Sequence, residues 1–275
     1  MTSRPMDAAS MLETLGVPRG GILYVQSSVD WMQRAGLRAP EVLSTLLDWT
    51  GPTGTLVMPS YPFHTTHQEY LSAAPTFDVR RTPATIGLMP EMFRRTAGVV
   101  RSLDPDFSVC ARGAEAEAIV GRVPAAPDPF GPDSSYQRML NRVTTLVGLG
   151  VSLNTNSFIH AIDSRAGAGY PTAVYDDRVY ATTVVDRQGN SRVVRRLCLR
   201  PPFQHLTSPS AIGDAMRPAS NVFASTEIDG AWFFKWDLSA WSAWCASHAA
   251  AQAAQGEWPC WLTRLGGALP SVQPS

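Results

Sequence analysis

Residues 146–163 read L-V-G-L-G-V-S-L-N-T-N-S-F-I-H-A-I-D, and they place a strand, a turn and a helix in direct succession. The apolar run over 143–149 predicts a buried strand that ends at Gly150. Residues that can cap a helix follow the turn, and the pattern then predicts a helix over 157–163. A buried strand that leads directly into a helix is typical of α/β proteins.

Two earlier apolar runs predict the neighbouring strands. Residues 21–25 form a short run of strand formers, followed by polar residues and by a helical pattern over 39–49. A second run over 54–58 stops at Pro59. Strand, turn, helix and strand in this order predict a βαβ unit with parallel strands. Both runs are almost continuously apolar, as expected for strands covered on both faces.

The rest of the chain predicts helices, loops and one hairpin. Residues 174–198 alternate in polarity around a polar break at 186–190, where Gly189 suits the positive φ of a hairpin turn. Residues 60–82 are expected to form a long loop over the active-site edge, and 122–135 an irregular connection. Helical patterns cover 83–96, 113–119 and 238–254. We therefore expect one mixed α/β domain over 1–275, with a central largely parallel sheet flanked by helices and an antiparallel insertion in the C-terminal third.

Composition excludes several classes of protein. Lys+Arg and Asp+Glu both number 23, so the net charge is zero and a nucleic-acid partner is not expected. The chain has no apolar run of the roughly 20 residues that a membrane span needs, and its start shows no secretory signal. A cytoplasmic location is therefore expected. The cysteines lack C-x-x-C spacing and are expected to be reduced thiols, with one disulfide pair left open: Cys110, Cys198, Cys245 and Cys260.

The predicted helix carries a candidate acid–base group. Ser157, His160 and Asp163 follow one another at a spacing of three, which keeps them on one side of a helix. A histidine just past the end of a parallel strand lies where open α/β sheets place their ligand sites. A hydroxyl and a carboxylate beside it can fix its tautomer and stabilise an imidazolium. The alternative is a buried structural histidine.

This segment resembles the aminoglycoside 3-N-acetyltransferase family, which has the pattern N-T-x-x-H-x-x-E here. Asn156 and His160 match it, whereas Ser157 and Asp163 replace Thr and Glu. Further family landmarks follow the same order along the chain, and the resemblance covers about 10–165. They are V-H-S-S at 24–28, G-T-L-V-M-P at 54–59, G-x-L-P-E-x-F-R at 86–94, R-S-x-H-P-x-x-S at 101–108 and G-x-x-S-P at 130–135.

The resemblance implies a single acyltransferase domain, dependent on coenzyme A, in which the amine attacks the thioester directly. The co-substrate would be acetyl-coenzyme A or another short acyl-coenzyme A. His160 would be the general base, oriented by Asp163 and Ser157. The candidates for coenzyme A contact are Ser27, Ser28, Arg101 and Ser108, with helix capping and loop attachment as the alternatives. The candidates for acceptor contact are Tyr61, His64, Asp104 and Asn156.

Two departures from the family pattern affect the expected acceptor. Gln26 and Asp104 stand where relatives commonly have histidine, which leaves His160 as the family-position histidine. The chain also lacks an acidic run for a polycationic aminoglycoside, so an amino sugar with one amine is the expected acceptor. Four scattered aspartates that the fold could gather argue the other way: Asp104, Asp106, Asp128 and Asp133. Four tryptophans could stack on a sugar, or form core or an oligomer interface: Trp232, Trp236, Trp241 and Trp244.

Other functions stay open at this point. A true aminoglycoside resistance enzyme is the first alternative. A Ser/His/Asp hydrolase is another, although the chain has no G-x-S-x-G motif, and an inactive ligand-binding homologue is a third. His64 and His67 have H-x-x-H spacing, but no third ligand is evident, so no metal is expected. The expected partner is a small-molecule amine without nucleic acid or membrane, and a homodimer is left open.

Overall fold

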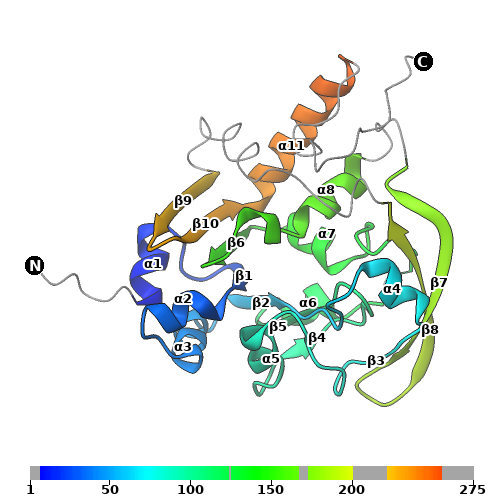
Figure 1. Ribbon diagram of the computed structural model, residues 1–275, viewed down its shortest axis with the longest axis horizontal. Coiled ribbons are helices and arrows are strands. Elements are labelled where there is room, and N and C mark those ends of the chain that lie inside the picture. The colour runs from blue at the N-terminus through cyan, green and yellow to red at the C-terminus, as the bar shows by residue number, and fades with distance from the viewer. Residues whose placement is uncertain (1–6, 124, 167–172, 201–221, 256–275) are drawn as a thin grey trace, which may run out of the picture.

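The computed structural model describes residues 7–123, 125–166, 173–200 and 222–255. Within these residues, the main sheet has seven strands in the order β4-β5-β2-β1-β6-β10-β9 (Figure 1). The central three, β2, β1 and β6, are parallel, and the strands on both sides pair antiparallel. The strands are β1 Ile22–Ser27, β2 Thr55–Pro59, β4 Val100–Arg101, β5 Val109–Gly113, β6 Thr144–Leu149, β9 Phe223–Ile228 and β10 Ala231–Asp237. The predicted α/β class with a parallel centre is confirmed.

Alternating side chains of this sheet bury two separate hydrophobic cores. In β1, Leu23 and Val25 point into one core, and Tyr24 points into the other. The first core is covered by α1 Ala8–Thr14, α2 Val29–Arg34, α3 Ala39–Thr50 and α5 Leu88–Arg94. The second is covered by α6 Ala116–Val120, α7 Ser135–Leu140, α8 Phe158–Ala166 and α11 Leu238–Ala253. The sheet is therefore covered on both faces, as its continuous apolar strands predicted.

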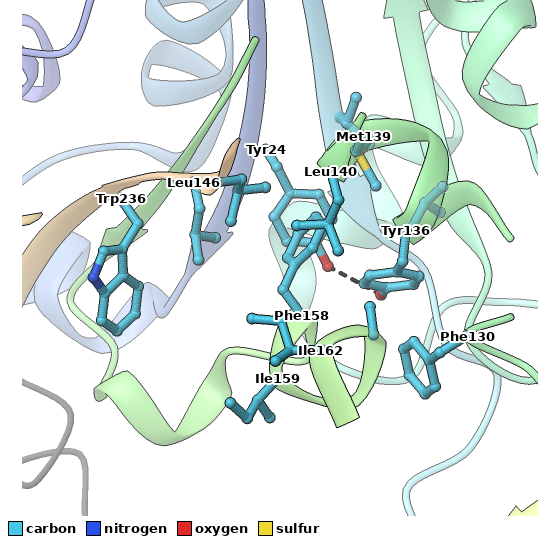
Figure 2. Packing of buried hydrophobic residues seen from close by; sticks show 14 of the residues in the cluster. Tyr24, Phe130, Tyr136, Met139, Leu140, Leu146, Phe158, Ile159, Ile162 and Trp236 are labelled. Carbon is cyan, nitrogen blue, oxygen red and sulfur yellow. Dashed lines mark hydrogen bonds between the residues drawn. The ribbon is translucent and has the colours of Figure 1, made fainter. Parts of the chain in front are cut away.

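The second core brings β1, α7 and α8 together. Figure 2 shows Tyr24, Tyr136 and Phe158 meeting at its centre. The ring of Phe158 lies 4.9 Å from that of Tyr24, edge to face, and the two tyrosine hydroxyls are 3.2 Å apart. Edge-to-face rings and paired hydroxyls satisfy both the apolar and the polar parts of these side chains. This packing seats α8 against the end of the parallel strands.

Two glycines allow β6 to end where it does. A Cβ at Gly148 would lie 2.1 Å from Cε1 of Phe234, so only glycine leaves room for that ring. Gly150 has φ +69°, and a Cβ there would lie 1.9 Å from Cδ1 of Trp31. Glycine adopts this left-handed conformation without the cost that other residues incur. The chain can therefore turn sharply into the short helix η1 Leu153–Thr155 and then into α8.

A second sheet joins β3 Thr76–Asp78 to the hairpin β7 Tyr175–Val185 and β8 Ser191–Leu199. The predicted hairpin is confirmed, with Gly189 at φ +90° in its turn. Figure 1 shows the hairpin at one edge of the molecule, with α4 His67–Ser72 packed against it. The prediction of a loop throughout 60–82 is wrong, because α4 and β3 lie there. Thr66 and Glu69 form a capping box at the start of α4, a signal present in the sequence.

The C-terminal part adds a hairpin that none of the predicted elements covers. β9 and β10 are joined at Asp229 and Gly230, both with positive φ, which is a typical Asp-Gly hairpin turn. The predicted helix over 238–254 is confirmed as α11, whereas α5 starts only at Leu88 and α6 only at Ala116. Cys260 lies outside the described residues. Among the described helices, none is long and apolar enough to cross a membrane.

Candidate active site

His160 lies in the first turn of α8, directly beyond the carboxyl end of β6. The side chain of Asn156 begins this helix, because its Oδ1 accepts the Phe158 N–H at 3.0 Å. Asn156 is buried, so its amide holds the helix start, and an acceptor contact by this residue stays a prediction. The position of His160 is the one that open α/β sheets use for their ligand sites.

His160 lines a cavity of about 520 Å³ at this edge of the sheet. The loop after β2 and the start of α4 form most of its wall, and single residues come from the segment before β5, from α8 and from β8. The lining residues are Phe63, His64, Thr65, Thr66, His67, Glu69, Phe107, His160 and Leu199. Segments far apart in the sequence thus meet around one cavity, which is large enough for a small molecule.

The surroundings of His160 keep its imidazole neutral. Its ring lies 5.3 Å from the ring of Phe130 and 6.4 Å from that of Phe107. Burial among these rings, and to a smaller extent the nearby His67, lowers the pKa of His160 to about 3. Its Nδ1 has no hydrogen-bond partner among the described residues. A neutral ring at physiological pH has a lone pair with which to accept a proton.

Ser157 and Asp163 do not hold His160 as the sequence pattern suggested. The hydroxyl of Ser157 bonds to buried Tyr61 and so opposes the rise that burial causes in the pKa of that tyrosine. Asp163 is fully buried, and its carboxylate contributes, after burial and Asp128, to the raised pKa of Tyr175. Because Nδ1 of His160 is unbonded among the described residues, Asp163 does not orient the ring through that atom. Their spacing predicted that these residues share one side of a helix but did not determine their partners, and Ser157 precedes α8.

A buried ionic cluster that no sequence pattern predicted lies beside the cavity. Arg196 of β8 donates from Nη2 to Asp104 at 3.0 Å and from Nε to Asp106 at 3.2 Å. His67 places Nε2 3.0 Å from Oδ2 of Asp106. Despite burial, Arg196 and His67 hold the pKa of Asp106 at about 2, whereas burial raises the pKa of Asp104 to about 6. Asp104 is thus paired in the interior, which argues against its predicted contact with the acceptor.

The four candidates for coenzyme A contact have different environments. Arg101 is buried, and its guanidinium donates to Ser108 and to the carbonyls of Thr82 and Ser60. Ser108 also donates to the Ser60 carbonyl at 2.5 Å. This geometry supports the alternative in which Arg101 and Ser108 attach a loop.

The two serines after β1 lie closer to the surface. Ser28 caps α2 by accepting the Asp30 N–H at 3.1 Å, whereas Ser27 ends β1 and is half-buried. Gln26 precedes them and bonds through its side chain to both the carbonyl and the hydroxyl of Thr155. The residue that replaces a family histidine thus joins β1 to the turn before α8.

Tyr61 and His64, the remaining candidates for acceptor contact, differ in burial. Tyr61 is buried and bonds to Tyr136, whereas His64 is exposed at the cavity wall. Among the described residues, no group of three or more His, Cys, Asp or Glu side chains could hold a metal ion. His64 therefore stays a candidate for acceptor contact.

The tryptophans do not form an exposed sugar-binding wall. Trp236 and Trp241 are fully buried, with their rings stacked 5.2 Å apart. Trp244 stacks on His248, and Trp232 is 44% exposed on β10. The core interpretation therefore fits Trp236 and Trp241.

Comparisons with known proteins point to one family. The sequence model of the family described as aminoglycoside 3-N-acetyltransferase matches residues 24–232. Aminoglycoside N(3)-acetyltransferase IV from Salmonella sp is 33% identical over 172 residues, covering 61% of each chain. The matches to curated relatives of this kind span about half to three fifths of the relatives' length.

Solved structures share the fold. A structure described as AAC-IIIb binary with CoASH has a TM-score of 0.67 at 20% identity, covering 89% of this chain and 95% of that one. A mutant of aminoglycoside acetyltransferase AAC(3)-IVa in complex with apramycin has a TM-score of 0.66 at 21% identity, covering 94% and 100%. The similarity extends beyond residue 165, where the sequence resemblance faded.

Proposed function

Because this chain belongs to the aminoglycoside 3-N-acetyltransferase family, we propose that it is a coenzyme A-dependent N-acyltransferase that acts on the amine of a small molecule. The observation that carries the proposal is the neutral imidazole of His160 on the wall of a cavity at the carboxyl ends of the parallel strands. The named relative is an N(3)-acetyltransferase, and a neighbouring structure is a complex with CoASH. Both support acetyl-coenzyme A, or a short acyl relative, as co-substrate.

The reaction is a direct transfer without an acyl-enzyme. The amine nitrogen attacks the thioester carbonyl, the new N–C bond forms, and the C–S bond breaks with its electron pair going to sulfur. His160 takes a proton from the attacking nitrogen and returns one to the leaving thiolate. An unprotonated imidazole suits the first role, because the base must be neutral before attack. Ser27 and Ser28 are the proposed contacts for the pantetheine arm, since Ser27 ends β1, the strand beside β6, and Ser28 follows it.

The acceptor we propose is an amino sugar, or a related small molecule, with one amine. Asp104 and Asp106 are engaged by Arg196 in the interior, and Asp128 accepts the Phe130 N–H at 2.7 Å. Glu69 is the one carboxylate among the described residues that line the cavity, and its Oε2 accepts both the N–H and the hydroxyl of Thr66. A polyamine would meet few counter-charges at this wall. His64 and Tyr61 are the proposed contacts around the sugar.

A second candidate is a true aminoglycoside 3-N-acetyltransferase. The family description and the neighbour bound to apramycin favour it. The two candidates share the chemistry at His160 and differ only in how many ammonium groups the acceptor site accommodates.

Steady-state release of the coenzyme A thiol separates these candidates. With acetyl-coenzyme A as donor, kcat/KM should be higher for a mono-amino sugar than for gentamicin or kanamycin. The reverse preference would establish the aminoglycoside enzyme. Hydrolysis of an ester without coenzyme A would support the Ser/His/Asp hydrolase, and absence of thiol release with every amine would support an inactive binding homologue.

A further inference from the structure

A second cavity, of about 770 Å³, is lined by α8 and α11, and none of its described lining residues belongs to the cavity at His160. Figure 1 shows these two helices side by side, with the end of α11 reaching beyond the other described elements. The segment between α7 and β6 contributes to the wall of this space, which we call the α11 groove. The residues of α11 that line it form one helix face: Ser239, Ser242, Ala243, Ala246, Ala249 and Ala250.

α11 lacks strongly charged side chains along its whole length, since none of its sixteen residues is Asp, Glu, Lys or Arg. Leu238, Trp241 and Cys245 pack into the second hydrophobic core, so one side of the helix is buried. On the groove side, Ala243 and Ala246 are exposed. A helix with one face in water normally carries charged residues on that face, and a helix without them is usually covered all round. The composition of α11 therefore indicates that a further segment or molecule covers the groove.

The other walls of the groove combine exposed apolar surface with a guanidinium. Val143 lies directly before β6 and is 78% exposed. Arg165 donates from Nη1 to Oγ of Ser242 at 3.1 Å and from Nη2 to Oδ1 of Asn141 at 2.6 Å. Its third acceptor, Gln137, is also neutral, and no carboxylate in the described part of the chain pairs with it. An occupant should therefore be largely apolar and should place electronegative groups near Arg165.

The sequence that follows α11 carries the side chains that such a groove needs. Four bulky apolar residues recur at i, i+3, i+4 and i+7, the spacing of one helix face: Trp258, Trp261, Leu262 and Leu265. Large side chains reach native packing density against small ones, and the groove face of α11 presents alanines. The apolar residues of this segment and the uncharged face of α11 are therefore complementary.

The segment can reach the groove from the end of α11. The described residues of this part end at Gln255, two residues beyond α11, and Gly256 can adopt the conformations that a chain reversal needs. At about 1.5 Å rise per helical residue, residues 258–265 would span about 10 Å, whereas the groove face of α11 spans about 16 Å. A segment that runs back along α11 would end at Gly266, near Arg165, and a cation is favourable at the carboxyl end of a helix.

We propose that residues 258–265 occupy the α11 groove of their own chain, with Trp261 and Leu262 against the alanines of α11. This inference goes beyond the proposed function and does not depend on it. α8 presents His160 to one cavity and Arg165 to the groove. An occupied groove therefore supports, from the groove side, the helix that carries the proposed base.

Cysteine crosslinking identifies the occupant. Leu262→Cys is combined in turn with Ala243→Cys, Ala246→Cys or Ala250→Cys, each time with Cys260→Ser, in the full chain. A disulfide forms only where the two Cα atoms lie within about 7 Å. After oxidation, at least one pair should give a disulfide within a single chain, which mass spectrometry of the linked peptides identifies. Disulfide-linked dimers would assign the groove to a second copy and overturn the inference, and so would the absence of a disulfide in all three pairs.

Cys260 supplies the matched control. At helical spacing it lies about 200° around the axis from Trp258, so it points away from the face that carries Leu262. Ala246→Cys alone, with Cys260 kept, should therefore form several-fold less disulfide within the chain than Ala246→Cys with Leu262→Cys. Equal yields would show contact without this packing and would contradict the proposal.

A charge placed in the groove tests whether the groove is covered. Ala246→Glu would bury an unpaired carboxylate beneath the segment, so the melting temperature should fall by several degrees. Ser247→Glu adds the same charge at the next residue of α11, which is exposed and does not line the groove, and should change the melting temperature by no more than about a degree. Equal melting temperatures for the two variants would mean that the groove stays open to water, and the proposal would fall.

Discussion

Nη2 of Arg196 lies 3.0 Å from Oδ1 of Asp104, and both side chains are buried. Asp104 stands at a position where the family pattern has histidine, so an ion pair to the β7–β8 hairpin occupies the place of that side chain. The same guanidinium reaches Asp106 and, through it, His67. The hairpin thereby becomes part of the structure that supports the cavity.

The carboxyl of Asp104 should weaken the fold as the pH rises. Burial raises its pKa to about 6 from an ordinary value of 3.8. A carboxyl with a raised pKa favours folding while protonated, so its contribution is complete below about pH 4 and is lost as the pH passes through 6. The unfolding free energy of Asp104→Asn, relative to that of wild type, should therefore rise between pH 4 and pH 7. Urea unfolding of both proteins across that range measures the difference.

Asp106→Asn serves as the matched control for Asp104→Asn. The pKa of Asp106 is lowered to about 2, so its contribution is present above about pH 4 and is lost as the pH falls through 2. Asp106→Asn should thus be less stable than wild type at pH 7. Parallel pH profiles for wild type and both variants would contradict this assignment of the two carboxyls.

Gly150→Ala should be far more harmful than Gly189→Ala. Both glycines have positive φ, which costs alanine roughly 1–3 kcal/mol. A Cβ at Gly150 also meets Trp31 at 1.9 Å, whereas a Cβ at Gly189 has nothing within 4 Å. Guanidinium unfolding should show a modest loss for Gly189→Ala and a much larger one for Gly150→Ala. Equal losses would mean that the turn after β6 does not depend on this close approach.

Substitution of a buried tryptophan should lower the unfolding free energy more than substitution of an exposed one. Trp236→Ala should cost about 3–5 kcal/mol in unfolding free energy, because its ring is fully buried. Trp232→Ala should cost less than about 1 kcal/mol, since 44% of that side chain is exposed. Chemical denaturation measures both. A weaker acceptor affinity for folded Trp232→Ala, without loss of stability, would restore the sugar-stacking hypothesis for that residue.

The sequence predicted the elements whose signals are local. The apolar runs at β1, β2 and β6 indicated the parallel centre, and Gly189 marked the β7–β8 turn. Two local signals were overlooked: the capping box of Thr66 and Glu69 at α4, and the Asp-Gly turn at Asp229 between β9 and β10.

The candidate site was harder to predict beyond His160. Arg196 and Asp104 are 92 residues apart in the chain, and no periodicity links them. Their pairing follows from the packing of a hairpin against a loop, which is a tertiary effect. The same holds for Arg101, for which the family-like motif suggested a coenzyme A contact, whereas its guanidinium donates to the carbonyls of Thr82 and Ser60.

The most direct test of the central claim compares wild type with His160→Gln in two assays. Thermal shift with acetyl-coenzyme A measures donor binding, where a ligand at a hundredfold over its Kd stabilises by about 2.7 kcal/mol. Thiol release with a mono-amino sugar measures transfer. We predict that both proteins are stabilised alike and that His160→Gln turns over on the order of 100-fold more slowly. Wild-type turnover in His160→Gln across neutral pH, or no shift of wild type with any short acyl-coenzyme A, would contradict the account.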